Sequence, residues 1–233
     1  MTALMFFALT VNCLAADFSL SAGGGGLAGY TFTRYSLEGG SVKSVQSMDR
    51  FDYGGFLFFD ATYAEFSLMC KGGNYTYSEK VADSLVNSKG TGSETSIGFS
   101  LLGKYPLSLN NKITWFPMFG IDYQIALTQI RQPDGNISYD RSKGELASDR
   151  DVDDKPYPLS AWNSLWIEIG AGLDFSINGP LFLRSEFLFG FRLPTVYEMG
   201  ALEFAKMQMN MDNPKLGGLT GNPSLKVAIG YMF

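Results

Sequence analysis

The clearest signal in the chain is an alternation of apolar and mixed positions from Ile113 to Leu127. Every second residue, counted from Ile113, is apolar, aromatic or proline, whereas the positions between include Thr114, Asp122 and Gln124. A period of two residues is that of a strand with two different faces. At ~3.3 Å per residue, the stretch is long enough to cross a bilayer core when tilted. The pattern therefore predicts a long strand with one oily face.

Seven further segments repeat this alternation, which gives eight strands in all. They are Phe18–Phe32, Phe51–Phe59, Ala64–Cys70, Ile97–Tyr105, Leu165–Phe175, Leu181–Leu193 and Leu225–Phe233. Short turns are expected at Asp60–Thr62, Pro106–Asn111 and Ile177–Pro180. Long polar loops are expected at Thr33–Asp49, Gly72–Gly92, Gln129–Ala161 and Thr195–Asn222. This pattern predicts an all-β fold, an eight-stranded antiparallel transmembrane up-and-down barrel with short periplasmic turns and long extracellular loops.

Charged residues of both signs occupy the mixed face of these segments. Buried ions are tolerated when they are partnered, so such charges would pair across a narrow lumen. We therefore expect a lumen charge network of Glu65, Lys71, Glu94, Lys104, Asp122, Glu168, Asp174, Arg184, Glu186, Arg192 and Lys226. Asp52 and Asp60 are also expected to face inward, because a carboxylate on the lipid face is costly.

A soluble lipocalin-like barrel is the main structural alternative, since it also has eight strands. In that arrangement the charged face would lie in water and the oily face inside. We favour the transmembrane arrangement because the strands are long, the opposite face is broadly aromatic, and the chain ends on Phe233.

The first residues have the features of an export signal. Met1–Ala16 contains an apolar run that is too short to span a bilayer as a helix. Small residues at Cys13 and Ala15 suit cleavage after Ala15 or Ala16, so residues 17–233 are predicted to form the barrel. No Lys or Arg precedes the run; either the start lies upstream or the terminal amine supplies the charge. The alternatives are a lipid-modified Cys13 and a first core strand.

Composition limits the chemistry that the chain can perform. It contains no histidine, which removes Ser-His-Asp catalysis, the usual zinc sites and most general-base schemes. The net charge of −5 and the absence of a basic stripe argue against nucleic acid as a partner. Charged residues make up 18 % against a usual ~25 %, and aromatic residues 15 %, which suits a sheet with one oily face. We expect no catalytic, cofactor-binding or metal-binding residues.

Three local motifs have both a structural and a functional interpretation, and we favour the structural one each time. Asp149-x-Asp151-x-Asp153 is similar to the start of a calcium loop, but glycine and glutamate are missing where that loop needs them. A solvated acidic loop is therefore favoured over weak calcium binding. Gly23–Gly26 lacks the Lys-Ser/Thr of a phosphate loop and is expected to thin or bend its strand. Glu168 and Glu186 suggest a carboxylate pair, but pairing with Arg184 explains them better.

The end of the chain carries the most specific motif. The alternating run Val227, Ile229, Tyr231 and Phe233 resembles the C-terminal signature that the outer-membrane assembly machinery reads. The eight-strand count resembles the OmpX, OmpA-transmembrane and OmpW group, and the Gly-rich opening looks like small barrels of spirochaetes. The resemblance implies a bacterial outer-membrane location, with membrane lipid and the assembly machinery as partners.

Two functions remain open from the sequence. The first is a structural and surface-interaction barrel, whose lumen is filled by side chains and whose loops contact a host or environmental ligand. The second is an OmpW-like narrow channel for small hydrophobic molecules. Its support is a set of large apolar residues on the inward positions: Phe116, Met118, Trp166, Phe182, Leu188 and Met232. The same residues also suit a filled barrel end.

Overall fold

A computed structural model describes residues 19–39, 42–81, 87–133, 137–146, 149–151, 153–200 and 215–233. The expected signal segment, residues 1–16, lies outside these residues. Eight long strands form one antiparallel ring, in the order β4-β3-β2-β1-β10-β9-β8-β6, and β6 pairs back with β4. They are β1 (Leu20–Gly39), β2 (Val42–Ala61), β3 (Ala64–Val81), β4 (Asn87–Lys104), β6 (Ile113–Pro133), β8 (Ser164–Asn178), β9 (Leu181–Arg192) and β10 (Lys215–Met232). The predicted fold class is confirmed.

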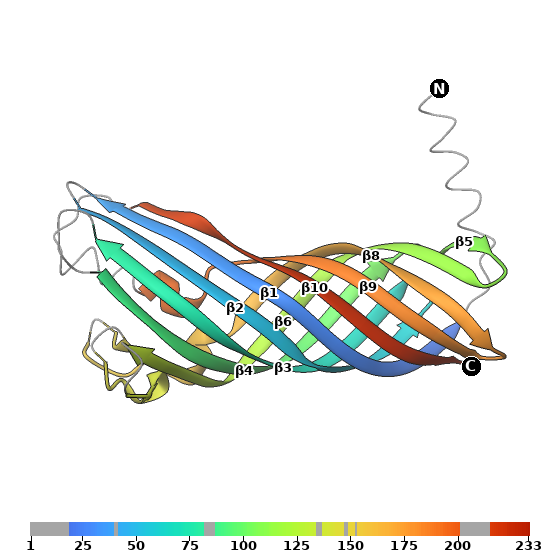
Figure 1. Ribbon diagram of the computed structural model, residues 1–233, viewed down its shortest axis with the longest axis horizontal. Coiled ribbons are helices and arrows are strands. Elements are labelled where there is room, and N and C mark those ends of the chain that lie inside the picture. Colours follow the sequence, from blue (N-terminus) through green and yellow to red (C-terminus); the bar gives the residue numbers. More distant parts are fainter. Residues whose placement is uncertain are drawn as a thin grey trace, which may run out of the picture.

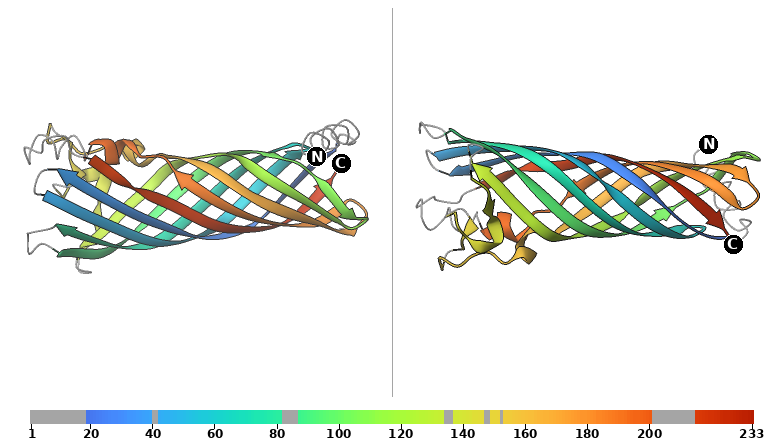
Figure 2. Two further views of the ribbon diagram at one scale, coloured as in Figure 1. Left: turned by 90° about the horizontal axis from the view of Figure 1, so that it is seen from above. Right: turned by 60° about the horizontal axis from the view of Figure 1, so that its bottom comes forward.

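The barrel is elongated, and its two ends differ (Figures 1 and 2). At one end, here the turn end, lie the short connections, the small strand β5 (Leu107–Asn110) beside β6, and the chain terminus at Phe233. At the other, here the loop end, lie the strand β7 (Tyr139–Asp140) and the 3-10 helices η1 (Arg141–Lys143) and η3 (Leu159–Trp162). No helix within the described residues is long and apolar enough to cross a membrane.

The strands run much further toward the loop end than the sequence pattern predicted. Two of the four expected long loops, Thr33–Asp49 and Gly72–Gly92, are largely strand: β1 continues to Gly39 and β2 starts at Val42. The alternation did not predict strand in these two segments, because it identifies a strand only where one of the two faces is apolar. A closed ring pairs the backbone of each strand on both sides, so a polar segment can extend the ladder without lipid contact.

The apolar belt is concentrated in the half of the barrel nearer the turn end. β2 has 20 residues, about twice the 9–11 that cross a bilayer. Its outward side chains Phe51, Tyr53, Leu57 and Phe59 are 48–63 % exposed, and all of them lie from the middle of the strand onward. The same half carries exposed apolar residues on other strands, among them Phe66, Leu101, Phe119, Ile169, Phe187 and Ile229. The other half of the barrel projects beyond this belt.

A β-bulge in β6 shifts by one residue the positions whose side chains face the lumen. The register between β4 and β6 shifts at Thr95 and Ser96. Leu127 and Thr128 are therefore both exposed, and Gln129 returns to the lumen at 2 % exposure. A bulge of this kind inserts one residue and reverses the parity beyond it.

Candidate functional site: the charged lumen

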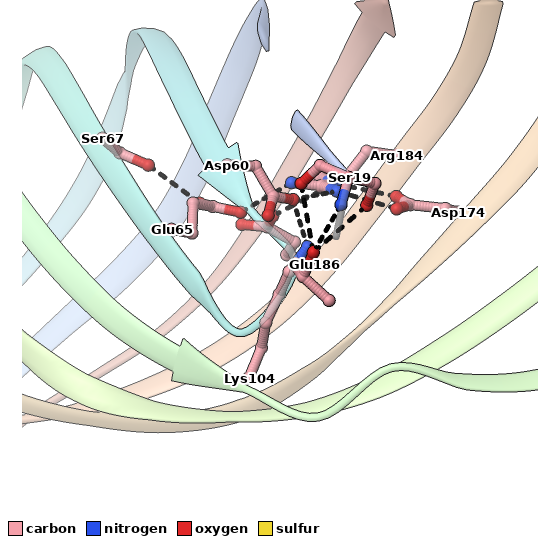
Figure 3. A network of polar contacts seen from close by, with 9 residues as sticks. Ser19, Asp60, Glu65, Ser67, Lys104, Asp174, Arg184 and Glu186 are labelled. Atoms are coloured by element: carbon pink, nitrogen blue, oxygen red, sulfur yellow. Dashed lines mark hydrogen bonds and ion pairs between the residues drawn. The ribbon is translucent and has the colours of Figure 1, made fainter. Parts of the chain in front are cut away.

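Arg184 is the centre of the best-defined polar cluster in the lumen (Figure 3). It extends from β9 and is 1 % exposed. Its guanidinium donates to carboxylate oxygens of Asp60, Glu65 and Asp174, each at 2.7 Å, and lies 3.8 Å from Glu186. These acids come from β2, β3, β8 and β9, so a single side chain ties opposite walls of the barrel together.

The carboxylates around Arg184 have further donors. Lys104, from β4, forms an ion pair with Asp60, and the Ser67 hydroxyl donates to Glu65 at 2.8 Å. Bidentate and multiply bonded pairs of this kind are the strong ones in a low-dielectric interior. The cluster therefore satisfies most of its buried charge without water.

Three phenylalanine rings surround the guanidinium of Arg184. Its central carbon lies 4.4 Å from the ring centroid of Phe58, 5.1 Å from that of Phe116 and 5.2 Å from that of Phe182. A cation this close to aromatic faces is attracted by them, more strongly when it is desolvated. The rings also keep water away from the ion pairs.

Each of these rings fits because its cross-strand partner is glycine. A Cβ built on that glycine would lie 2.2–2.6 Å from the ring, closer than atoms can approach. The pairs are Phe58 with Gly23, Phe116 with Gly172, and Phe182 with Gly230. The glycine-rich opening of β1 thus thins the wall at Gly23, where the sequence suggested thinning or bending.

The middle of the lumen carries a looser set of charges. Lys71 lies 3.7 Å from Asp122, and Lys226 lies 4.0 Å from Glu186. A cavity of about 10 Å³ there is lined by Lys71, Glu168 and Lys226 among others. One Glu168 oxygen and the Lys226 ammonium have no hydrogen-bond partner within the described residues. A space of this size is at the lower limit for one water molecule, which these atoms would hold.

Toward the loop end, two arginines continue the pattern. Arg50 from β2 pairs with Asp52 and with Glu94 of β4, and it is 4 % exposed. Arg192 forms an ion pair with Glu198 near the mouth. Side-chain pairs therefore follow one another through the lumen, from the turn end to the loop end.

The structure places every residue of the expected charge network on the inward positions. Most are buried, whereas the side chains of Glu94, Asp174 and Arg192 are 13–19 % exposed because they lie near the ends of the network. The sequence could not predict which of these charges would lie next to one another. The expected assembly residues Val227, Ile229, Tyr231 and Phe233 point outward and are 43–73 % exposed.

Two basic residues of the site, Arg50 and Arg141, were not predicted from the sequence. Arg50 has the same parity as Asp52 but lies one residue before the expected start of its strand. Extending that strand by one residue would have included it. Arg141 lies in a loop, where alternation gives no signal.

Arg141 organises a cap at the loop end. Its guanidinium lies 5.0 Å from the ring of Trp162 and 4.5 Å from that of Tyr197, and it donates to Asp149 at 3.0 Å. Burial acts to lower the pKa of Arg141, but neighbouring Tyr197 and Asp149 outweigh it and hold the pKa above its ordinary value. Asp149 is 1 % exposed. The expectation of a fully solvated acidic loop is therefore wrong at Asp149, because the loop folds back and pairs it.

This cap packs onto the lumen wall. Trp162 and Tyr157 form a buried cluster with Ala126, an inward residue of β6. Asn163, just after η3, accepts a hydrogen bond from the backbone of Ala126 at 3.0 Å. The segment between β6 and β8 thus covers part of the mouth.

Together these features define the class of the protein. A closed even-numbered ring leaves no backbone group unpaired, and an apolar belt outside with charges inside is the arrangement of barrels that span the bacterial outer membrane. The chain is an outer-membrane β-barrel.

Known proteins that resemble the chain are found among solved structures only. No protein-family model and no curated protein matches the chain. Among solved structures, it is similar to the outer membrane protein OprG of Pseudomonas aeruginosa, with 12 % identity, coverage of 93 % of this chain and 96 % of that one, and a TM-score of 0.48. It is also similar to the outer membrane protease OmpT of Escherichia coli, with 9 % identity, coverage of 94 % and 99 %, and a TM-score of 0.41.

A third solved structure is Ail, the attachment invasion locus protein of Yersinia pestis, in complex with the heparin analogue sucrose octasulfate. It has 11 % identity, coverage of 92 % and 99 %, and a TM-score of 0.32. Similarity at this level concerns the barrel alone. Membership of the OmpX, OmpA-transmembrane and OmpW group stays a prediction.

Proposed function

We propose that this protein is a closed barrel that conducts no solute and acts through the surface it presents outside the cell. The filled lumen is the observation that carries the proposal. Arg184 connects opposite walls through four carboxylates, and the cavity in the middle has about 10 Å³. An eight-stranded barrel encloses a space that side chains just fill. The proposal includes no catalytic step, because the chain has no histidine to act as a base.

The apolar inward residues do not favour the alternative, a conduit for small hydrophobic molecules. Phe116, Met118 and Leu188 pack with Leu102 in one cluster whose members are 0–2 % exposed. Met232 has the inward parity but is 47 % exposed at the strand end. Packed side chains of this kind leave no continuous gap for a solute.

Conductance tests the closed lumen directly. The refolded protein, inserted in planar lipid bilayers, should give no defined current steps, with an unrelated porin as a positive control for insertion. A stable wild-type conductance would refute the closed barrel. Saturable binding of a small apolar molecule in the lumen would do the same and support the conduit.

The external role is supported by exposed apolar side chains at the loop end. Ile137, Val196 and Met199 are 59 %, 66 % and 50 % exposed on the side away from the belt. Exposed apolar residues at this end of the barrel suit contact with another surface.

An adherence assay tests this role. Cells of a non-adherent bacterium that produce the wild type should adhere better to cultured animal cells and to polystyrene than cells that lack it. The double change Val196→Ser and Met199→Ser should remove that gain. Leu109→Ser is the matched control, because Leu109 is 63 % exposed at the opposite end. Wild-type production without any gain, or an equal loss in the control, would contradict the role.

A further inference from the structure

The outer wall of the barrel carries a groove that is separate from the closed lumen. It lies across β2, β3 and β4, in the half that projects beyond the belt, and its volume is about 540 Å³. Its outward lining residues are Ser47, Asp49, Thr76, Ser78, Lys89 and Thr91.

The groove begins directly above the apolar belt. Phe51, which is 58 % exposed, is the last aromatic of the belt on β2, and Asp49 is the next outward residue toward the loop end. Two residues along a strand are about 7 Å. Asp49 pairs with Thr76, and Thr76 with Thr91, so one polar row crosses the three strands at this height. A membrane places lipid headgroups at this level.

The lining is rich in hydroxyl groups. Ser47 and Ser78 lie 2.8 Å apart through their hydroxyls, on neighbouring strands. Thr76 and Thr91 add two more on the adjacent row. Hydroxyls act as donors and acceptors together, which matches the hydroxyls of a sugar.

The groove carries one acid, Asp49, and one base, Lys89. Asp49 is already paired, since it accepts from Arg34 at 2.7 Å and from the Tyr30 hydroxyl at 2.8 Å. Lys89 is exposed, and no described residue forms an ion pair with it. An ammonium group with three free donors can hold a phosphate.

We propose that this groove binds the phosphorylated sugar headgroup of a lipid in the outer leaflet. The acyl chains would lie on the belt below, beside Phe51. The sugar would lie against the hydroxyls of Ser47 and Ser78, and its phosphate would reach Lys89. Because the groove continues an established lipid-facing surface, one amphiphilic molecule can occupy both.

Native mass spectrometry of the full barrel in mixed micelles tests the proposal, with lipid A as a diphosphorylated glycolipid probe. Lipid A should bind more tightly than its fully dephosphorylated form and than phosphatidylcholine. Lys89→Gln should weaken lipid A binding about tenfold, the loss of one charged contact. Ser78→Leu should also weaken it, because the larger side chain fills the groove. Lys112→Gln is the matched control, since Lys112 is exposed at the turn end.

Four results would overturn the proposal, and the first three concern the variants and the lipid probes. They are an unchanged affinity in Lys89→Gln, an equal loss in Lys112→Gln, and equal binding of the dephosphorylated lipid. The fourth is displacement of lipid A by millimolar inorganic phosphate, because it would show a site for a free anion. Folding of each variant is checked by its heat-dependent gel mobility. The measurement does not depend on the conductance of the lumen.

Discussion

Replacing Arg184 with methionine tests whether the lumen network holds the barrel together. The change keeps much of the apolar stem and removes the cation. Asp60 retains Lys104, but no ion pair within the described residues remains for Glu65, which is 0 % exposed. Leaving one buried charge without its partner costs about 3–5 kcal/mol. The loss of the ion pair with Asp174 adds less to this cost, because the Asp174 side chain is 19 % exposed.

Arg34→Met is the matched control for this change. Arg34 also makes an arginine–aspartate pair at 2.7 Å, with Asp49, but the side chains are 51 % and 32 % exposed. Exposed pairs of this kind contribute about 0–1 kcal/mol. Each variant therefore removes an arginine–carboxylate ion pair, which is buried in the first case and exposed in the second.

The assay is urea unfolding of the refolded protein in phospholipid vesicles, followed by tryptophan fluorescence. Arg184→Met should lower the free energy of unfolding by several kcal/mol more than Arg34→Met. Adding Glu65→Gln to Arg184→Met should recover part of the loss, because the orphaned charge is then gone. Equal, small losses in both arginine variants would refute the idea that the network stabilises the barrel.

Further changes test the wall, the assembly signal and the orientation. Gly172→Val should destabilise the barrel by about 1–3 kcal/mol in the same assay because the new side chain meets the Phe116 ring, whereas Gly26→Ala, whose new Cβ would have its nearest contact at 3.8 Å, should not. Deleting Phe233 should reduce insertion, measured as the folded fraction in the outer membrane, while synthesis and export stay normal; an unchanged yield would show that the terminal aromatic is not read. A protease site inserted at Asp153, whose side chain is 68 % exposed, should be cut on intact cells. Cleavage only after the outer membrane is broken would reverse the orientation.

The predicted strands were most accurate where lipid imposes the pattern. Ile113–Leu127 alternates because outward residues meet acyl chains and inward residues meet the lumen, and β6 starts at Ile113 as predicted. Beyond the belt that constraint disappears, so the hydroxyl-rich ends of β2, β3 and β4 resembled loops. Only the closed ring, which pairs each backbone on both sides, shows that they are strand.

The sequence by itself determined the class of fold and the face on which each charge lies, because alternation at period two is a local property. Which charges meet was decided by the tertiary structure. Arg184 and Glu65 are separated by 119 positions along the chain, and only barrel closure and strand register bring them to 2.7 Å. The cap around Arg141 and the groove beside Lys89 likewise join segments distant in sequence, so neither could be found before the ring was closed.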